Sequence, residues 1–153
     1  MVERLQAGEV LADAKFALVR FHQCGDDQER RVLWFSLIGM LRAVGHVLDK
    51  VDAPADAELR RRVNAWWPAA KQKPIFRDFV ERERNEFLKT YQPMPRRSVI
   101  CTRGGQVLMT SGGSPIVTSD LYVVEGPFAG RPASEVAGEA VAWWEAQLAS
   151  LAA

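Results

Sequence analysis

Apolar residues recur along most of this 153-residue chain at intervals of three and four positions, which is the period of an amphipathic helix. Apolar side chains cover more than half of the circumference of segment 26–51, so we expect it to be the central helix, ending before Pro54. Short connections between the helices favour an antiparallel bundle of four to five helices, and therefore a mainly α fold. The predicted helices span residues 2–22, 26–51, 54–70, 74–91 and 132–151.

Residues 96–125 break the helical pattern and form a β-rich insertion before the last helix. β-type runs occupy 98–103, 106–110 and 116–125, and Gly104-Gly105 is a hairpin turn signal between the first two runs. The sequence predicts a small antiparallel hairpin or a three-stranded meander here, or else a long mobile loop. We expect one domain over 1–153, with a helical part at 1–91, the insertion at 96–125 and a C-terminal helix at 132–151.

Glu83 falls near the middle of the apolar face of helix 74–91. A carboxylate on a core face must find a partner or take up a proton, because burying an unpaired charge is costly. Arg42 and His46 share a stripe of helix 26–51, and we expect them to form a buried polar network with Glu83. In the alternative interpretation, that stripe is a solvated charge cluster and Glu83 reaches solvent or pairs with an arginine of a neighbouring helix.

Positive charge is concentrated in the middle of the chain. The net charge is +1, but residues 56–97 hold eleven Lys and Arg against six Asp and Glu. This segment would suit RNA or another anionic partner, although an ordinary solvated helix surface has a similar composition. The candidate RNA- or anion-binding residues are Arg60, Arg61, Arg62, Arg77, Arg96 and Arg97.

Cys24 and Cys101 do not make a disulfide framework, and the N-terminus carries charges where a secretory segment would need an apolar run. We therefore expect reduced thiols in a cytoplasmic protein. The longest apolar run, 32–41, is too short to span a bilayer, so no membrane association is expected. No residues have a recognisable metal-ligand spacing and no nucleotide-binding loop occurs, so we expect no metal and no cofactor.

Glu83-Arg84-Asn85 followed by Tyr91 resembles the signature of the HEPN superfamily, prokaryotic helical-bundle domains that include RNA-cleaving toxins and defence proteins. That signature is an Arg, often followed by a polar residue such as Asn, and a His four to six residues further on. Arg84 and Asn85 match its start, whereas Lys89, Thr90 and Tyr91 occupy the places open to the histidine. In active members of the family, two such motifs meet across a homodimer and cleave RNA without metal.

The resemblance implies Arg84, Asn85, Glu83 and Tyr91 as catalytic candidates. Arg84 would stabilise the charged phosphorane, and Glu83 is the nearby candidate base, because a tyrosine with a pKa of about 10 is a poor base at neutral pH. One hypothesis is a HEPN-like bundle that acts mainly as an interaction module, self-associates as a homodimer or binds a partner protein, and pairs Glu83 with Arg84. The other is an RNA-binding protein or weak metal-independent endoribonuclease that uses Arg84.

Overall fold

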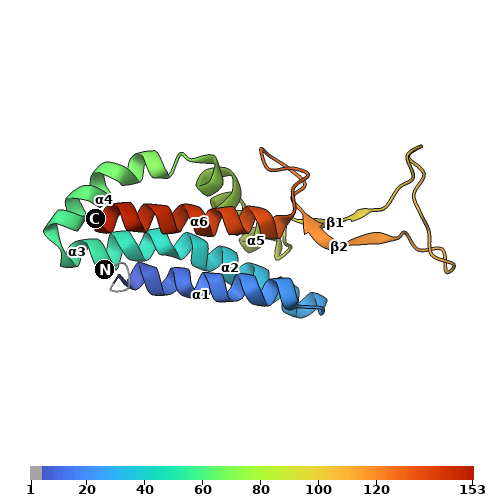
Figure 1. The fold of residues 1–153 in the computed structure, drawn as a ribbon, viewed down its shortest axis with the longest axis horizontal. Coiled ribbons are helices and arrows are strands. Elements are labelled where there is room, and N and C mark those ends of the chain that lie inside the picture. The colour runs from blue at the N-terminus through green and yellow to red at the C-terminus, as the bar shows by residue number, and fades with distance from the viewer. Residues whose placement is uncertain (1–4) are drawn as a thin grey trace.

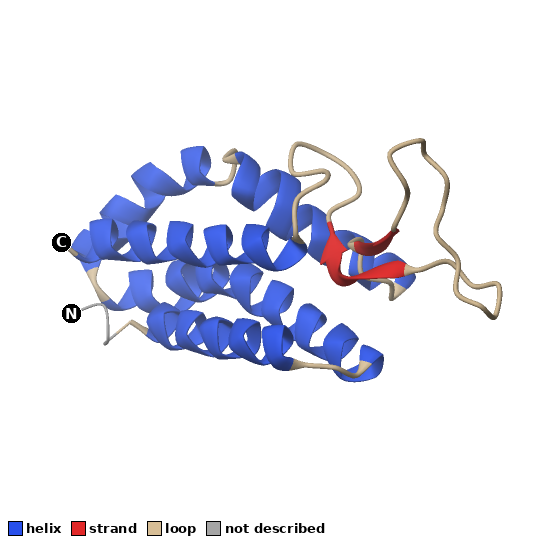
Figure 2. Ribbon diagram, turned by 45° about the vertical axis from the view of Figure 1, so that its right-hand side comes forward, coloured by secondary structure: helices blue, strands red, loops and turns tan. Residues whose placement is uncertain are grey.

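The computed structural model describes residues 5–153 and consists of a helical bundle from which a β arm projects (Figure 1). Helices α1 (Gln6–Gln23), α2 (Asp27–Val47) and α6 (Ala133–Ala152) lie alongside one another, and α4 (Ala57–Ala70) and α5 (Arg82–Thr90) complete the bundle. The helices and the antiparallel hairpin before the last helix confirm the predicted fold class (Figure 2). The α2 helix contacts α1, α6 and α5, which confirms it as the central helix.

The prediction that the central helix ends before Pro54 is wrong, because the helical run continues past this proline. It continues through a π-helical turn, η2 (Leu48–Asp52), into α3 (Ala53–Ala55). The N–H of Ala53 donates to the carbonyl of Leu48, five residues back, and this wider turn accommodates a proline that has no N–H of its own. The whole run, Asp27–Ala55, has the length and hydropathy of a membrane span, but a core helix meets the same criteria, and 39% of its apolar window is buried here.

The predicted helix 74–91 consists of a π-helical segment, η3 (Ile75–Glu81), followed by α5. A π-helical turn holds more residues than an α-helical turn, but the expected apolar face stays buried as far as Phe87. The buried stripe runs from Phe79 and Val80 to Glu83 and Phe87. Tyr91 does not continue this stripe, because it ends the helix in the left-handed conformation with φ 53° and is 60% exposed.

The core joins residues from every long helix and is rich in aromatic side chains around Trp144. Trp67 and Trp144 approach the α2 backbone at Gly45, where an added Cβ would lie 2.3 Å from the Cη2 atom of Trp67. Only a residue without a side chain allows this approach, so Gly45 is required by packing. Gly39, on the same helix, has nothing within 4 Å of such a Cβ.

The β arm begins with β1 (Arg96–Val99), which pairs with β2 (Val117–Tyr122) in an antiparallel ribbon. Arg96 lies opposite Tyr122 and Val99 opposite Val117, with an irregularity of register between Arg97 and Val99. Beyond the ribbon, the chain makes two further turns with isolated bridges at Cys101–Val107 and Met109–Pro115. The arm is therefore a hairpin with a folded tip, and it extends away from the bundle (Figures 1 and 2).

Candidate functional site between α2 and α5

Glu83 lies inside the core, with 3% of its surface exposed. Its carboxylate accepts hydrogen bonds from Nε1 of Trp34 at 2.8 Å and from the backbone N–H of Met94 at 2.9 Å. Burial raises the pKa of this carboxyl, and the two hydrogen bonds oppose that rise. Through these two hydrogen bonds, the carboxylate connects α2 to the segment that joins α5 to the β arm.

The expected partners of Glu83 lie elsewhere. Arg42 places its Nε 3.4 Å from the carboxylate of Glu81 and its guanidinium over the ring of Phe76, and His46 is exposed. The predicted buried network of Glu83 with Arg42 and His46 is therefore wrong, because the indole of Trp34 and a backbone N–H satisfy the carboxylate instead. Those partners follow from tertiary packing, which helical spacing within one segment does not reveal.

Arg84 points to the outside of α5 and donates from Nη1 to Oδ1 of its neighbour Asn85 at 3.0 Å. The expected ion pair between Glu83 and Arg84 is absent among the described residues. Successive helical residues point about 100° apart, so one enters the core while the next reaches solvent. Of the four residues suggested by the motif, Arg84, Asn85 and Tyr91 are exposed and Glu83 is not.

Arg84 instead lines an open groove between α2 and α5, which we call the α2–α5 groove. Gly39 and Ala43 contribute small residues to it, while Phe35 and Leu88 contribute apolar side chains, Leu88 being 57% exposed. Phe35 is held in place by stacking on Phe87, with ring centroids 4.2 Å apart. The lining consists of Phe35, Gly39, Arg42, Ala43, His46, Arg84 and Leu88.

The charge balance of this face is positive. The carboxylates beside it are already paired, Glu81 with Arg42 and Glu86 with Lys89. Within residues 5–153, the guanidinium of Arg84 has no carboxylate partner. At the end of the same face, Arg31 lies over the ring of Tyr91, 5.9 Å from its centroid. An anionic or acidic occupant would therefore meet free positive charge here.

The other candidate anion-binding residues are dispersed, and none of the six lines the α2–α5 groove. Arg61 and Arg62 both bind Glu58 on α4 and hold the pKa of its carboxyl at about 2. Arg60 is exposed on the same helix. Each of the remaining three already has a partner within the chain. Arg77 pairs with Asp78, Arg97 pairs with Asp27 of α2, and Arg96 donates to the carbonyl of Pro95.

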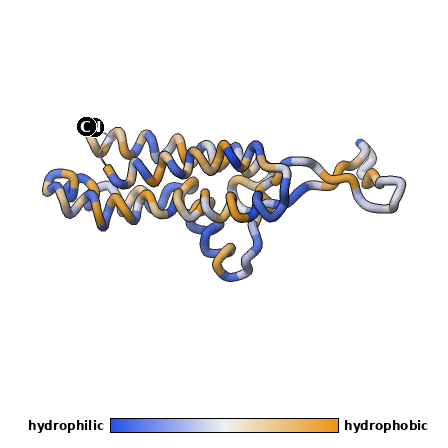
Figure 3. The backbone as a smooth tube through the Cα atoms, turned by 90° about the horizontal axis from the view of Figure 1, so that it is seen from below, coloured by the Kyte–Doolittle hydropathy of each residue, from blue (hydrophilic) through white to orange (hydrophobic). Residues whose placement is uncertain are grey.

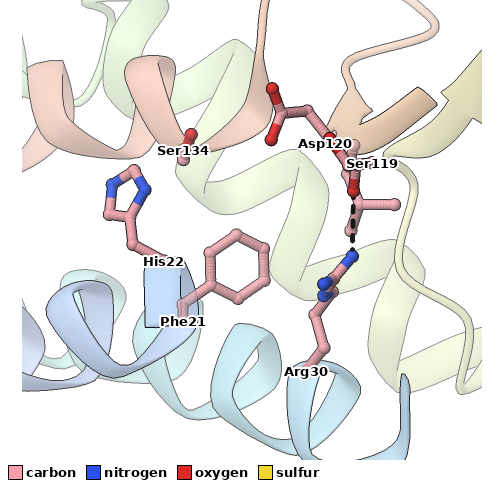
Figure 4. A pocket seen from close by; sticks show the side chains of 7 residues that line it. Phe21, His22, Arg30, Ser119, Asp120 and Ser134 are labelled. Atoms are coloured by element: carbon pink, nitrogen blue, oxygen red, sulfur yellow. Dashed lines mark hydrogen bonds between the residues drawn. The ribbon is translucent and has the colours of Figure 1, made fainter. Parts of the chain in front are cut away.

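A second, smaller pocket lies where the end of α1 meets β2 and the start of α6 (Figure 4). It brings His22, Asp120 and Ser134 together from distant parts of the chain, beside Arg30, which donates to the carbonyl of Ser119 at 3.1 Å. No hydrogen bond links His22, Asp120 and Ser134 to one another, so they do not form an aligned nucleophile and base. Across residues 5–153, no three His, Cys, Asp or Glu side chains are grouped to hold a metal ion.

The chain matches no family model, no curated protein and no solved structure. The function of this protein therefore has to follow from its own residues and their arrangement. Sequence reasoning identified Arg84 but missed Leu88, although its position four residues further along the same helix was a usable signal. It also missed Trp34 as the partner of Glu83, for which no local signal existed.

Proposed function

We propose that this protein is a cytoplasmic, HEPN-like helical bundle that works mainly as a binding module. In this proposal, the α2–α5 groove holds an acidic amphipathic helix of a partner protein. The observation that carries it is the separation of Glu83 from Arg84: the candidate base is closed inside the core while the arginine lines an open groove. Because Glu83 cannot reach a substrate, the base implied by the motif is missing from the groove, which supports binding over the catalysis expected from that motif.

The shape of the α2–α5 groove favours a helix as its occupant. Gly39 and Ala43 allow a partner backbone to come close, and Phe35 and Leu88 offer apolar contact on either side. This is the arrangement in which an amphipathic helix binds a groove through residues spaced by three and four. Arg84 then supplies the charge that an acidic residue at the edge of that helix would meet.

A second copy of the chain fits this groove less well. A two-fold contact places the same patch of both copies together, so the two Arg84 guanidinium groups would face each other. Like charges in contact are unfavourable unless an anion lies between them. A different, acidic partner therefore suits the charge of the α2–α5 groove better, and the predicted homodimer needs another surface.

Fluorescence anisotropy with two labelled helical peptides tests this proposal. Both carry the same apolar face, and one has glutamates and the other lysines on its polar face. We expect the acidic peptide to bind with a Kd in the micromolar range and Arg84→Glu or Leu88→Glu to weaken it at least about tenfold. Arg60→Glu, an exposed charge reversal on α4, is the matched control. Equal binding of both peptides, or no effect of Arg84→Glu, would contradict the proposal.

RNA is the second candidate partner, because His46 and Arg84 line the same groove from different helices. In this alternative, His46 takes the proton of a ribose 2′-hydroxyl while that oxygen attacks the phosphorus. The P–O5′ bond then breaks, leaving a 2′,3′-cyclic phosphate and a 5′-hydroxyl that receives a proton. Arg84 would stabilise the charge on the phosphoryl oxygens, and Tyr91 could stack on a base.

Incubating a single-stranded RNA oligonucleotide with the full chain in EDTA separates the two candidates. The RNA alternative predicts a cyclic-phosphate product, lost in His46→Ala and Arg84→Ala but kept in Glu83→Gln. Intact RNA with no shift in anisotropy would eliminate RNA as the partner and leave the acidic helix.

A further inference from the structure

The tip of the β arm, residues 99–118, is built on one pattern repeated every eight residues. An apolar residue followed two positions later by threonine occurs at Ile100, Leu108 and Ile116. The first two repeats share a Gly-Gly pair, at 104–105 and 112–113. Each of the predicted β-type runs, 98–103, 106–110 and 116–125, contains one of these apolar–threonine pairs.

The three repeats meet in a closed ring of hydrogen bonds. The N–H of Ile100 donates to the carbonyl of Ile116 at 2.8 Å, that of Ile116 to Leu108 at 2.9 Å, and that of Leu108 back to Ile100 at 2.9 Å. The ring relates the three segments by an approximate three-fold axis. The arm tip is therefore a hydrogen-bonded, three-leaved unit and not a meander of three regular strands.

The threonines stabilise the first two leaves in the same way. The hydroxyl oxygens of Thr102 and Thr110 each accept from a backbone N–H four residues on, both at 3.2 Å. Gly105 and Gly113 close the two turns with φ of 83° and 81°, which other residues rarely adopt. In the third leaf, Thr118 accepts from the N–H of Ser98 at 3.0 Å, so the ribbon itself takes the place of a turn.

The arm tip exposes much of its apolar surface. Ile100, Leu108 and Ile116 are 38%, 40% and 36% exposed, and these similar values agree with the three-fold arrangement. None of residues 99–118 belongs to the bundle core or packs against it. The apolar stretches are visible on the projecting arm in Figure 3. Seven of the fourteen exposed large apolar residues in the described chain lie here: Val99, Ile100, Val107, Leu108, Met109, Ile116 and Val117.

The scarcity of charged side chains on the arm tip narrows the choice of partner. Between residues 98 and 119, Arg103 is the single charged side chain. One arginine does not suit a nucleic acid or an anionic lipid surface, which are bound through several cations. The partner surface should be apolar and uncharged as well. On the described chain, the surface that best meets this description is the arm tip of another copy, because the exposed apolar residues of the bundle stand among charged side chains.

We propose that the arm tips of two copies bind each other face to face, so that the arm is the self-association surface of this protein. A face with approximate three-fold symmetry matches its own copy across a two-fold axis, with each leaf meeting a leaf. Each copy would bury on the order of a few hundred Å², which is at the low end for specific interfaces and predicts a weak, concentration-dependent dimer. The arm holds this contact away from the bundle, so the α2–α5 groove stays open.

Sedimentation equilibrium of the full chain from about 1 to about 200 μM measures this association. We expect a monomer–dimer equilibrium whose Kd rises at least about tenfold in Leu108→Lys, which places a charge at one of the three residues of the hydrogen-bonded ring. Leu88→Lys, an exposed apolar position in the α2–α5 groove, is the control and should leave the Kd unchanged. A monomer throughout the range, or a dimer disrupted by Leu88→Lys alone, would overturn the proposal.

A spin label supplies a measurement that needs no disruptive variant. Cys101 is exposed on the arm tip and Cys24 is buried, so a thiol-specific nitroxide labels Cys101 selectively. Stacked sheets lie about 10 Å apart, so two labels should give a distance on the order of 20 Å in concentrated samples. A dimer without any distance below about 40 Å would mean that the copies meet through their bundles, and the arm would then be excluded as the self-association surface.

Discussion

The indole of Trp34 donates a 2.8 Å hydrogen bond to the carboxylate of Glu83 in the interior of the bundle. The backbone N–H of Met94 donates to the same oxygen at 2.9 Å. The carboxylate thus connects α5 to α2 and to the start of the β arm, so Glu83 is a structural residue. We expect the effect of replacing it to depend on which hydrogen-bond donors are left without a partner.

Glu83→Gln should be tolerated, whereas Glu83→Ala should not. The amide oxygen of glutamine can accept from both Trp34 and Met94, so we expect a change in the free energy of unfolding of about 1 kcal/mol or less. Alanine leaves two buried donors unsatisfied and creates a cavity, which should cost about 3 kcal/mol. Urea denaturation followed by tryptophan fluorescence measures both. Equal losses in the two variants would show that the hydrogen bonds contribute little.

The stability of the wild-type protein should also depend on pH through Glu83. Burial raises the pKa of this carboxyl in the folded state above its ordinary value of 4.5. The folded protein then holds a proton that the unfolded chain has already released, so the free energy of unfolding falls as pH rises from about 4.5 to the raised pKa. Glu83→Gln has no such proton, and subtracting its pH profile cancels the contribution of exposed pairs such as Arg61 and Glu58. A flat difference profile would contradict the raised pKa.

Two glycines of α2 should respond to alanine in opposite directions. Gly45→Ala would place a Cβ 2.3 Å from Trp67 and 2.9 Å from Trp144, and we expect a net loss of about 1–3 kcal/mol despite the better helix propensity of alanine. Gly39→Ala meets nothing within 4 Å and should raise stability by up to about 1 kcal/mol. Thermal unfolding of the two variants side by side measures the difference. A stabilising Gly45→Ala would refute the close approach of the tryptophans.

Asp52 should stabilise the first turn of α1 from a distance. Its carboxylate accepts from the N–H groups of Gln6 and Ala7, both at 2.9 Å, and Leu5 supplies no side-chain cap of its own. Asp52→Ala should cost about 1–2 kcal/mol, the usual value of an N-cap, and should speed amide hydrogen exchange at Gln6 and Ala7. Asp56→Ala, which removes the cap of α4, is the control: it should destabilise the protein to a similar degree without affecting those two amides.

The spacing of apolar residues predicted the helices of the bundle well, because each long helix buries one face and that face fixes where its apolar residues lie. The errors have specific physical causes. The π-helical turn at Leu48–Asp52 keeps Pro54 inside the helix, and Tyr91 leaves the buried face because it ends α5 in the left-handed conformation. The partner of Glu83 depends on tertiary packing. The repeat in the arm tip was visible in the sequence, but strand propensity alone does not reveal a ring of three segments.

The link that Glu83 holds is also the base of the β arm. Met94 and the buried Pro95 lead directly into β1, so the carboxylate of Glu83 helps to set the direction in which the arm leaves the bundle. The ion pair of Arg97 with Asp27 and the hydrogen bond of Arg30 to Ser119 also hold the ribbon against α2. A rigid ribbon magnifies rotation at its base: with about 3.3 Å per residue, a tilt of about 10° displaces a tip ten residues away by about 6 Å. The position of a distant apolar surface thus depends in part on a residue that never reaches solvent.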